Sequence, residues 1–450
     1  MYIDFLLERF SEHSDKDAIV WNEKIYSYDW MLHRIDYWQN LLNTENIEPG
    51  KVVIMEADFS PNSVALLLAL IEHQSIIVPL TSTVEAKKKE FIQISEGELS
   101  FQIDAQDNID IVRFPGNANH KIYQQIRKEH HPALVLFSSG STGESKAAVH
   151  DFSNLLKKYH TKRHDLKTLT FLLFDHIGGI DTMLYSLSNG SCIITVQDRS
   201  PDNVCRMIEK FAVEVLPVTP TFLNLLILSQ AYEKYDLSSL RYITYGTEVM
   251  PEVTLKKCSE LFPDVIILQK YGTTEVGTLR SKSKDSKSLW VKIGGEGFET
   301  RVVDGILHIK AVSAMIGYLN APSPFSDDGW FITGDSVIQD GEYIRFLGRK
   351  SEIINVGGEK VYPSQVESII QEMDNIAEVV VYGEKNNIIG NIVCAKVRLE
   401  KEEDIKDIRV RIKKYCRERL ENYMIPVKID IVTEEQHSLR FKKKRIKPSE

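Results

Sequence analysis

The sequence predicts an α/β protein with a large multilayer N-terminal domain and a smaller α+β C-terminal domain. Short β-rich runs alternate with helical stretches over most of the chain, which is typical of layered α/β domains. Beyond position 351 the pattern changes to that of a smaller α+β unit. The chain has 450 residues, and single hydrophobic cores rarely extend beyond about 250–300 residues.

Elements of the large domain follow one another in regular order. Residues 51–55 form a short apolar run, and Ser60-Pro61-Asn62 has the features of a helix start, with proline in the first turn. Residues 64–71 continue as a buried helix, and residues 75–80 return as a strand. Residues 281–288 contain four serines among lysines and an aspartate, so we expect an exposed loop there. Further short strands are predicted at 193–196, 213–218, 243–245 and 265–268.

The smaller unit begins after a predicted boundary at 348–351. We therefore divide the chain into domains 1–348 and 349–450. Residues 378–382 and 392–397 alternate like strands. One helical face is predicted to carry Ile405, Ile408, Ile412, Tyr415 and Leu420.

Bulk composition excludes several classes of protein. The net charge is −9, which argues against general nucleic-acid binding. The longest apolar runs, such as 64–71, are about half the roughly 18 residues of a membrane span. The first residues lack the pattern of a signal peptide, and the five cysteines are scattered without a Cys-x-x-Cys pair. We therefore expect a cytoplasmic protein with no membrane span and no structural zinc.

The most informative stretch is residues 138–146, Ser-Ser-Gly-Ser-Thr-Gly-Glu-Ser-Lys, directly after the apolar run 133–137. Its glycines let the backbone approach an anion closely, and exposed N–H groups of such a loop form an anion-binding nest. The spacing is not the Walker pattern. A flexible linker is the alternative, but a second apolar segment, 147–149, follows. The predicted polyphosphate-binding residues are Ser138, Ser139, Gly140, Ser141, Thr142, Gly143 and Lys146.

This stretch resembles the phosphate-binding motif of the adenylate-forming superfamily, which includes acyl-CoA synthetases, peptide-synthetase adenylation domains and firefly-type luciferases. Further motifs follow in family order across nearly the whole chain. They are Phe174-Asp175-His176-Ile177-Gly178-Gly179, Tyr271-Gly272-Thr273-Thr274-Glu275, Gly329-Trp330-Phe331-Ile332-Thr333-Gly334-Asp335, and Gly348-Arg349 running to Gly357-Gly358-Glu359-Lys360-Val361-Tyr362-Pro363.

The resemblance implies ATP as substrate and Mg²⁺ as cofactor. It makes Glu275 the catalytic metal ligand, as oxygen donors suit magnesium, and Thr274 a catalytic phosphate contact. Without it, residues 271–275 could be a turn and helix cap, Asp335 a turn residue and Arg349 a boundary salt bridge. Tyr271 would lie against the adenine, and Gly246, Thr247 and Glu248 would contact its other side. Gly272 and Thr273 are further predicted ATP-binding residues, and Asp335 and Arg349 would bind the ribose.

The resemblance also places the acid substrate. His176 is expected to act as the gate, with glycines that let an acyl group pass close to the backbone. The structural alternative is a capped turn that holds a satisfied histidine. A rival functional interpretation uses Asp175, which at this motif holds the α-ammonium in amino-acid-activating relatives. The predicted acyl pocket is His176, Ile177, Gly178, Gly179, Val276 and Gly277.

The basic run 440–445 is either a solvated tail or the family's lysine segment, Gly-Lys-x-x-Arg, whose lysine inserts into the active site. Lys442 and Arg445 match that spacing, but Phe441 stands where glycine is usual. Lys442 is the predicted catalytic lysine, and Lys443 is the alternative.

The resemblance finally implies a mobile C-terminal domain. Ser351 occupies the hinge position, which is normally aspartate or lysine, and Gly357 and Gly358 would line the thiol tunnel. No carrier domain is expected to be fused to the chain. Our leading hypothesis is an AMP-forming acyl- or aryl-CoA synthetase with CoA as acceptor. A stand-alone ligase that loads a separate carrier protein and a degenerate nucleotide-binding protein are the alternatives.

Overall fold

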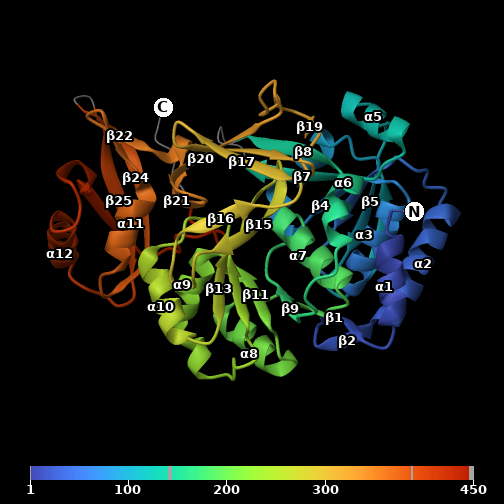
Figure 1. The fold of residues 1–450 in the computed structure, drawn as a ribbon, viewed down its shortest axis with the longest axis horizontal. Helices are drawn as coiled ribbons and strands as arrows, with labels where there is room; N and C mark the ends of the chain where they lie inside the picture. Colours follow the sequence, from blue (N-terminus) through green and yellow to red (C-terminus); the bar gives the residue numbers. More distant parts are fainter. Residues whose placement is uncertain (1, 140–143, 387–388, 445–450) are drawn as a thin grey trace.

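The computed structural model describes residues 2–139, 144–386 and 389–444, and these form three seven-stranded sheets and one five-stranded sheet (Figure 1). The α/β class and the separate C-terminal unit predicted from the sequence are confirmed. The first three sheets use strands up to position 349, and the fourth begins at position 354.

The first sheet is parallel apart from its final hairpin. Helices α8 (Pro201–Phe211), α9 (Pro220–Ser229) and α10 (Glu252–Leu261) bury their apolar residues in the same core as this sheet. Its strands, in spatial order, are β13 (Ile266–Gln269), β12 (Tyr242–Tyr245), β11 (Val215–Val218), β9 (Thr168–Thr170), β10 (Ile193–Thr195), β1 (Asp17–Trp21) and β2 (Lys24–Ser27).

The second sheet has a parallel centre flanked by antiparallel strands. In spatial order it contains β19 (Gly317–Tyr318), β8 (Ser145–Asp151), β7 (Ala133–Ser139), β4 (Ile76–Leu80), β3 (Val52–Glu56), β5 (Leu99–Ile103) and β6 (Ile109–Arg113). Helices α4 (Lys88–Ile94) and α5 (Lys121–Glu129) pack on its outer side, and the short α6 (Phe152–Leu156) follows β8.

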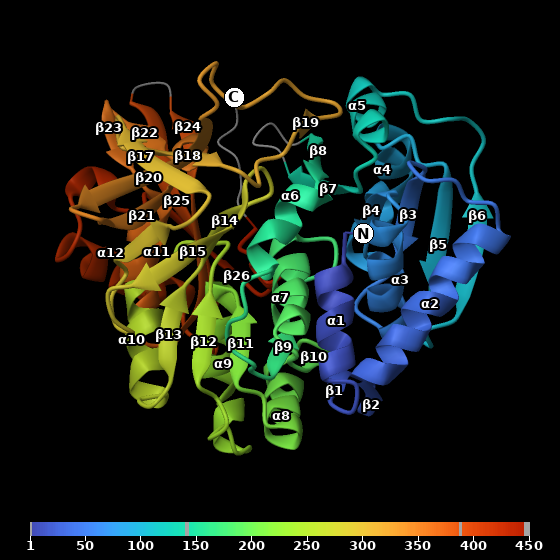
Figure 2. The same cartoon turned by 45° about the vertical axis from the view of Figure 1, so that its right-hand side comes forward.

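A layer of helices fills the space between these two sheets (Figure 2). It consists of α1 (Asp4–Glu12), α2 (Tyr28–Thr44), α3 (Pro61–Glu72) and α7 (Ile177–Ser188). The predicted start of α3 is confirmed, because Ser60 and Ser63 form a reciprocal capping box ahead of Pro61. Residues 61–71 of α3 are all buried, as expected for a helix that is apolar on every side.

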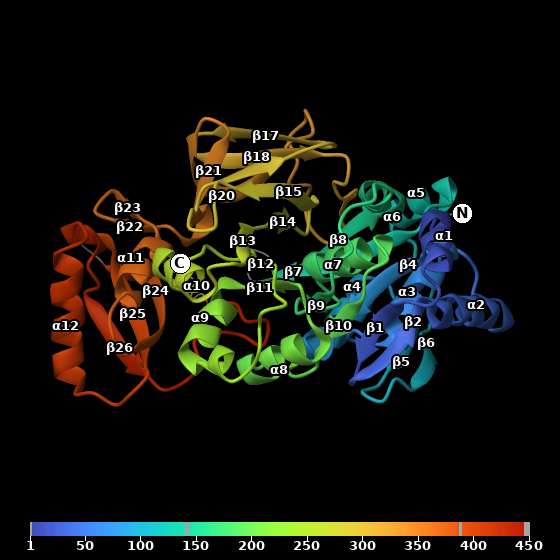
Figure 3. The same ribbon diagram turned by 60° about the horizontal axis from the view of Figure 1, so that its bottom comes forward.

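The third sheet is antiparallel throughout and lies across the ends of the other two (Figure 3). Its order is β14 (Tyr271–Thr273), β15 (Gly277–Ser283), β16 (Val291–Gly294), β21 (Tyr343–Arg349), β20 (Phe331–Asp340), β18 (Ile306–Ala311) and β17 (Phe298–Val303). The expected loop at 281–288 is therefore partly wrong. The first three residues of this segment continue β15. Ser283 is buried, and its hydroxyl accepts a hydrogen bond from the backbone amide of Gln269.

The C-terminal unit has its own apolar core. It contains β22 (Ile354–Val356), β23 (Glu359–Val361), α11 (Pro363–Gln371), β24 (Ile376–Asn386), β25 (Gly390–Leu399), α12 (Ile405–Arg417) and β26 (Lys428–Val432). The predicted apolar face of α12 is correct for Ile408 and Ile412, which are fully buried. It is wrong for Ile405, which is 50% exposed, and Leu420 lies beyond the helix end. In the described part of the chain, no helix is long and apolar enough to cross a membrane.

Candidate active site

Three predicted ribose and adenine residues form one cluster in the third sheet. The Tyr271 hydroxyl donates to Oδ2 of Asp335 at 2.6 Å, and Nε of Arg349 lies 3.1 Å from Oδ1 of the same carboxylate. Asp335 and Arg349 are also register partners on β20 and β21. Phe346 stacks against the Tyr271 ring, with centroids 4.7 Å apart. Burial raises the pKa of Asp335, and the Arg349 charge opposes that shift.

The turn that carries Thr274 and Glu275 joins β14 to β15 and is held from two other strands. Nε2 of His150, on β8, donates to the Thr274 carbonyl at 2.5 Å. Burial lowers the pKa of His150, so the neutral ring can use Nε2–H as a donor. The Tyr318 hydroxyl, on β19, donates to Oε1 of Glu275 at 2.6 Å. The predicted metal ligand is therefore oriented by a phenol that the motifs did not single out.

The predicted phosphate-binding loop follows β7. Ser138 and Ser139 end β7, and Lys146 pairs with Ser138 across the hairpin to β8. The Lys146 ammonium lies 5.4 Å from the centroid of the Tyr318 ring, which brings it to the same side chain that orients Glu275. The predicted contacts Gly140, Ser141, Thr142 and Gly143 lie outside the described residues.

The segment 246–248 follows β12, and its glutamate holds the C-terminal segment. Oε2 of Glu248 accepts from the Thr221 hydroxyl, and Oε1 accepts from the Lys443 amide, each at 2.6 Å. The predicted contact of residues 246–248 with adenine stays a prediction. Thr247 adopts a left-handed conformation, with φ of 72°.

His176 caps the start of α7, because Nδ1 accepts from the Gly178 amide at 3.1 Å. Burial, together with the Lys442 and Arg440 charges, lowers its pKa well below the ordinary value. A Cβ on Gly179 would lie 2.0 Å from the Leu173 carbonyl oxygen. This glycine thus permits a close approach of the chain's own backbone, and its predicted place in the acyl pocket stays a prediction. Val276 is fully buried, and Gly277 has a φ of 80°.

Asp175, the rival recognition residue, is already paired. Its Oδ2 accepts from Nη2 of Arg440 at 2.6 Å and from the Thr81 hydroxyl at 3.0 Å. The side chain is 5% exposed. Burial raises the pKa of Asp175 while Arg440 lowers it. Arg440 thus pairs with Oδ2 of Asp175, whereas Oδ1 of the same carboxylate is buried and has no hydrogen-bond partner among the described residues.

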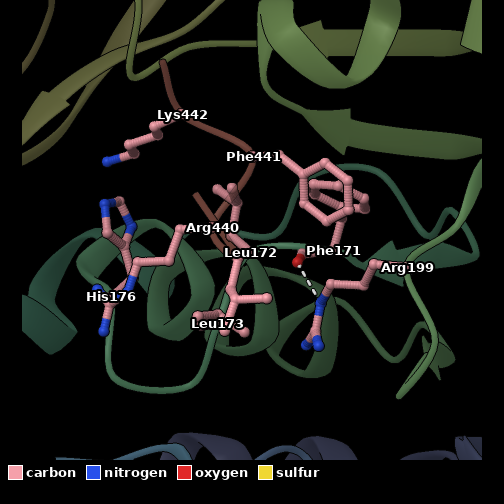
Figure 4. Close-up of a pocket in the computed structure, with 9 residues that line it drawn as sticks. Phe171, Leu172, Leu173, His176, Arg199, Arg440, Phe441 and Lys442 are labelled. Atoms are coloured by element: carbon pink, nitrogen blue, oxygen red, sulfur yellow. Dashed lines mark hydrogen bonds between the residues drawn. The ribbon is translucent and has the colours of Figure 1, made fainter. Parts of the chain in front are cut away.

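The segment 433–444, which we call the strap, runs from the C-terminal unit back to the centre of the molecule (Figure 3). Lys442 points toward the ring of His176 at a small pocket of about 20 Å³ that is open to solvent (Figure 4). Burial lowers the pKa of Lys442 to about 8. Phe171, Leu172, Leu173, Arg199 and Arg440 also line this pocket. Lys443 turns the other way, with its ammonium 2.8 Å from Oε2 of Glu367.

The predicted hinge and tunnel residues do not meet the other site residues in this arrangement. Ser351 is exposed in a single 3₁₀ turn, Lys350–Glu352, that follows β21. Gly357 and Gly358 form the exposed turn of the β22–β23 hairpin, with φ of 59° and 95°, and a Cβ on either would meet nothing within 4 Å. Their predicted role in thiol binding stays a prediction.

Two family models match the chain and cover most of it. The model of the AMP-binding enzyme matches residues 6–304, and that of the AMP-binding enzyme C-terminal domain matches residues 365–442. The chain belongs to the AMP-binding enzyme family. The resemblance seen in the sequence motifs is thereby confirmed.

Curated relatives within this family are CoA ligases. Indoleacetate–CoA ligase of Aromatoleum aromaticum is 30% identical over 293 residues, 59% of this chain and 57% of the relative. 2-Succinylbenzoate–CoA ligase of Bacillus licheniformis is 27% identical over 321 residues, 65% of each chain. The chain thus spans 57% and 65% of the length of these two relatives.

Solved structures share the fold over nearly the whole chain. The anthranilate CoA ligase AuaEII in complex with anthranoyl-AMP has a TM-score of 0.80 at 19% identity, covering 96% of this chain and 93% of that one. ATP-bound MatB from Rhodopseudomonas palustris has a TM-score of 0.79 at 21% identity, covering 98% and 97%.

Proposed function

We propose that this AMP-binding enzyme converts a carboxylic acid and ATP to an acyl-adenylate and then to a thioester of CoA. In the first step a carboxylate oxygen attacks the α-phosphorus of ATP, and pyrophosphate leaves. In the second step the CoA thiolate attacks the acyl carbon, and AMP leaves. Two anions must meet in the first step, so cations have to offset their repulsion.

The position of Lys442 carries this proposal. It is a buried cation at the pocket beside His176, and none of the described residues hydrogen-bonds or ion-pairs with its ammonium. A lysine held without a protein partner can bind the attacking carboxylate and the α-phosphate as they approach. Lys443 is committed to Glu367 and is a poorer candidate.

The remaining groups suit a nucleotide triphosphate. We assign the ribose hydroxyls to the Asp335 carboxylate, whose two oxygens can accept from both, and the β- and γ-phosphates to the loop 138–146. Glu275 fits a magnesium ion, because it is an oxygen donor with only Oε1 engaged, by Tyr318, within the described part of the chain. Bound Mg²⁺ would offset phosphate charge.

For the acid we propose an acyl or aryl group rather than an α-amino acid. The Asp175 carboxylate that would hold an ammonium is neutralised by Arg440. The named CoA-ligase relatives favour CoA as the acceptor over a separate carrier protein. We also propose that residues 349–450 rotate about Ser351, because the two half-reactions need different groups at one site.

The test is ATP–pyrophosphate exchange over a panel of carboxylic acids with Mg²⁺, followed by measurement of acyl-CoA with free CoA. We expect exchange with one class of acyl or aryl acid and release of its CoA thioester. Exchange without CoA consumption, together with acylation of a purified carrier protein, would move the acceptor to the carrier. Tight ATP binding without exchange for any acid would indicate a degenerate nucleotide-binding protein.

A further inference from the structure

Residues 438–442 of the strap form a tight hairpin that includes Lys442. The Ser438 amide donates to the Lys442 carbonyl at 2.8 Å, and the Phe441 amide donates to the Ser438 carbonyl at 2.9 Å. One end of the hairpin is fixed in the C-terminal unit, where Nδ1 of His437 lies 2.5 Å from Oε1 of the buried Glu378. These hydrogen bonds fix the conformation of the hairpin whose tip contacts the first sheet.

Phe441 at this tip has an unfavourable backbone conformation. Its φ is 52°, in the left-handed region that favours glycine and is rare for bulky residues. A glycine would adopt this conformation without strain. The aromatic side chain must therefore gain enough from its surroundings to offset the backbone cost.

The surroundings of the Phe441 ring supply that gain. The ring lies against Phe171, with centroids 5.2 Å apart (Figure 4). It also lies edge-on to Phe222 of α9, with centroids 5.6 Å apart. His437 stacks on it from within the strap at 5.7 Å. The backbone is fixed as well, because the Thr219 hydroxyl donates to the Phe441 carbonyl at 2.7 Å. Phe441 thus packs against the core of the first sheet.

We infer that Phe441 is a positioning residue, whose ring anchors the strap between Phe171 and Phe222 and so holds Lys442 at the reacting groups. Lys442 is the next residue, and its ammonium has no partner of its own among the described residues, so its direction depends on this anchor. The ring must also leave its site before the strap can withdraw. The anchor therefore favours the arrangement for acyl-adenylate formation over that for thioester formation. This inference rests on the proposed function.

The first test compares Phe441→Gly with Glu434→Gly. Glu434 is in the same strap but is exposed and does not line the pocket at Lys442, so its variant controls for added backbone freedom. We expect Phe441→Gly to slow ATP–pyrophosphate exchange about tenfold through kcat, with little change in the KM for ATP. Thioester formation from supplied acyl-adenylate should be as fast as in the wild-type enzyme or faster. Phe441→Leu should restore part of the exchange rate, and Glu434→Gly should match the wild-type enzyme.

A second test, limited proteolysis, does not depend on catalytic activity. Trypsin can cleave after Arg440, Lys442 and Lys443, and mass spectrometry measures the rate at the folded protein. We expect faster cleavage at the strap in Phe441→Gly and an unchanged rate in Glu434→Gly. Wild-type rates of both cleavage and exchange in Phe441→Gly would overturn the inference. Faster cleavage with no exchange by the wild-type enzyme for any acid would support the anchor and reject the proposed function.

Discussion

The ammonium of Lys443 lies 2.8 Å from a carboxylate oxygen of Glu367, a side chain that is 2% exposed. This pair joins the strap to α11 of the C-terminal unit and directs the Lys443 side chain away from the pocket. The adjacent Lys442 consequently points to the opposite side, toward His176. The ion pair gives a physical reason to choose between two neighbouring lysines that sequence spacing alone left open.

We therefore expect Lys442→Ala to reduce ATP–pyrophosphate exchange by about 10²- to 10³-fold, since it removes a charge that acts on the transition state. Thioester formation from supplied acyl-adenylate should remain near the wild-type rate. Lys443→Ala should lower the midpoint of thermal unfolding, because it removes the cation from a buried carboxylate. The reverse pattern, with exchange lost in Lys443→Ala alone, would shift the lysine register by one residue.

The burial of Lys442 predicts that the activity depends on pH. A pKa lowered to about 8 means that Lys442 loses its charge as pH rises through 8 rather than near 10.5. Glu248 and Asp175 act to keep the charge on Lys442, while Arg440 and Arg349 act against it. We expect kcat/KM for exchange to fall above pH about 8. Lys442→Arg should remove this alkaline limb, because arginine stays charged. An unchanged limb in Lys442→Arg would assign it to another group.

Much of the fold could be predicted because local patterns determine it. Ser60 and Pro61 mark a helix start, and continuous apolar runs mark strands buried on both faces. The site was harder, because the decisive contacts join residues far apart in the sequence. Arg440 meets Asp175 across 265 positions, and His150 meets Thr274 across 124. The spacing of residues within a motif does not predict contacts between distant segments. Tyr318 lies outside the motifs, so no pattern in the sequence indicated its contact with Glu275.

Replacing Asp175 tests the choice between an acyl acid and an amino acid. Asp175→Asn keeps the shape but removes the charge that Arg440 faces, so the strap should bind less well to the first domain. We expect exchange to fall about tenfold with the order of preferred acids unchanged. Arg440→Gln in the same background should add little, as expected for two partners of one ion pair. A preference for an amino acid in the wild-type enzyme that disappears in Asp175→Asn would reverse the assignment.

The last prediction concerns Ser351, in the exposed turn between β21 and β22. In this arrangement Lys442 lies at the pocket, whereas Gly357 and Gly358 lie at an exposed hairpin turn. The proposed role of these glycines in thiol binding therefore goes with the proposed rotation of the C-terminal unit. Proline fixes φ near −65°, which is compatible with a 3₁₀ turn but not with a large change of backbone angle. Ser351→Pro should therefore retain ATP–pyrophosphate exchange and lose acyl-CoA formation, while Ser351→Ala should retain both. Single-turnover assays of the two half-reactions measure this directly. If Ser351→Pro catalyses both steps at the wild-type rate, the backbone rotation occurs at another residue. Gly358→Leu would not isolate an effect on thiol binding, because a φ of 95° would strain the backbone of any residue with a side chain at this position.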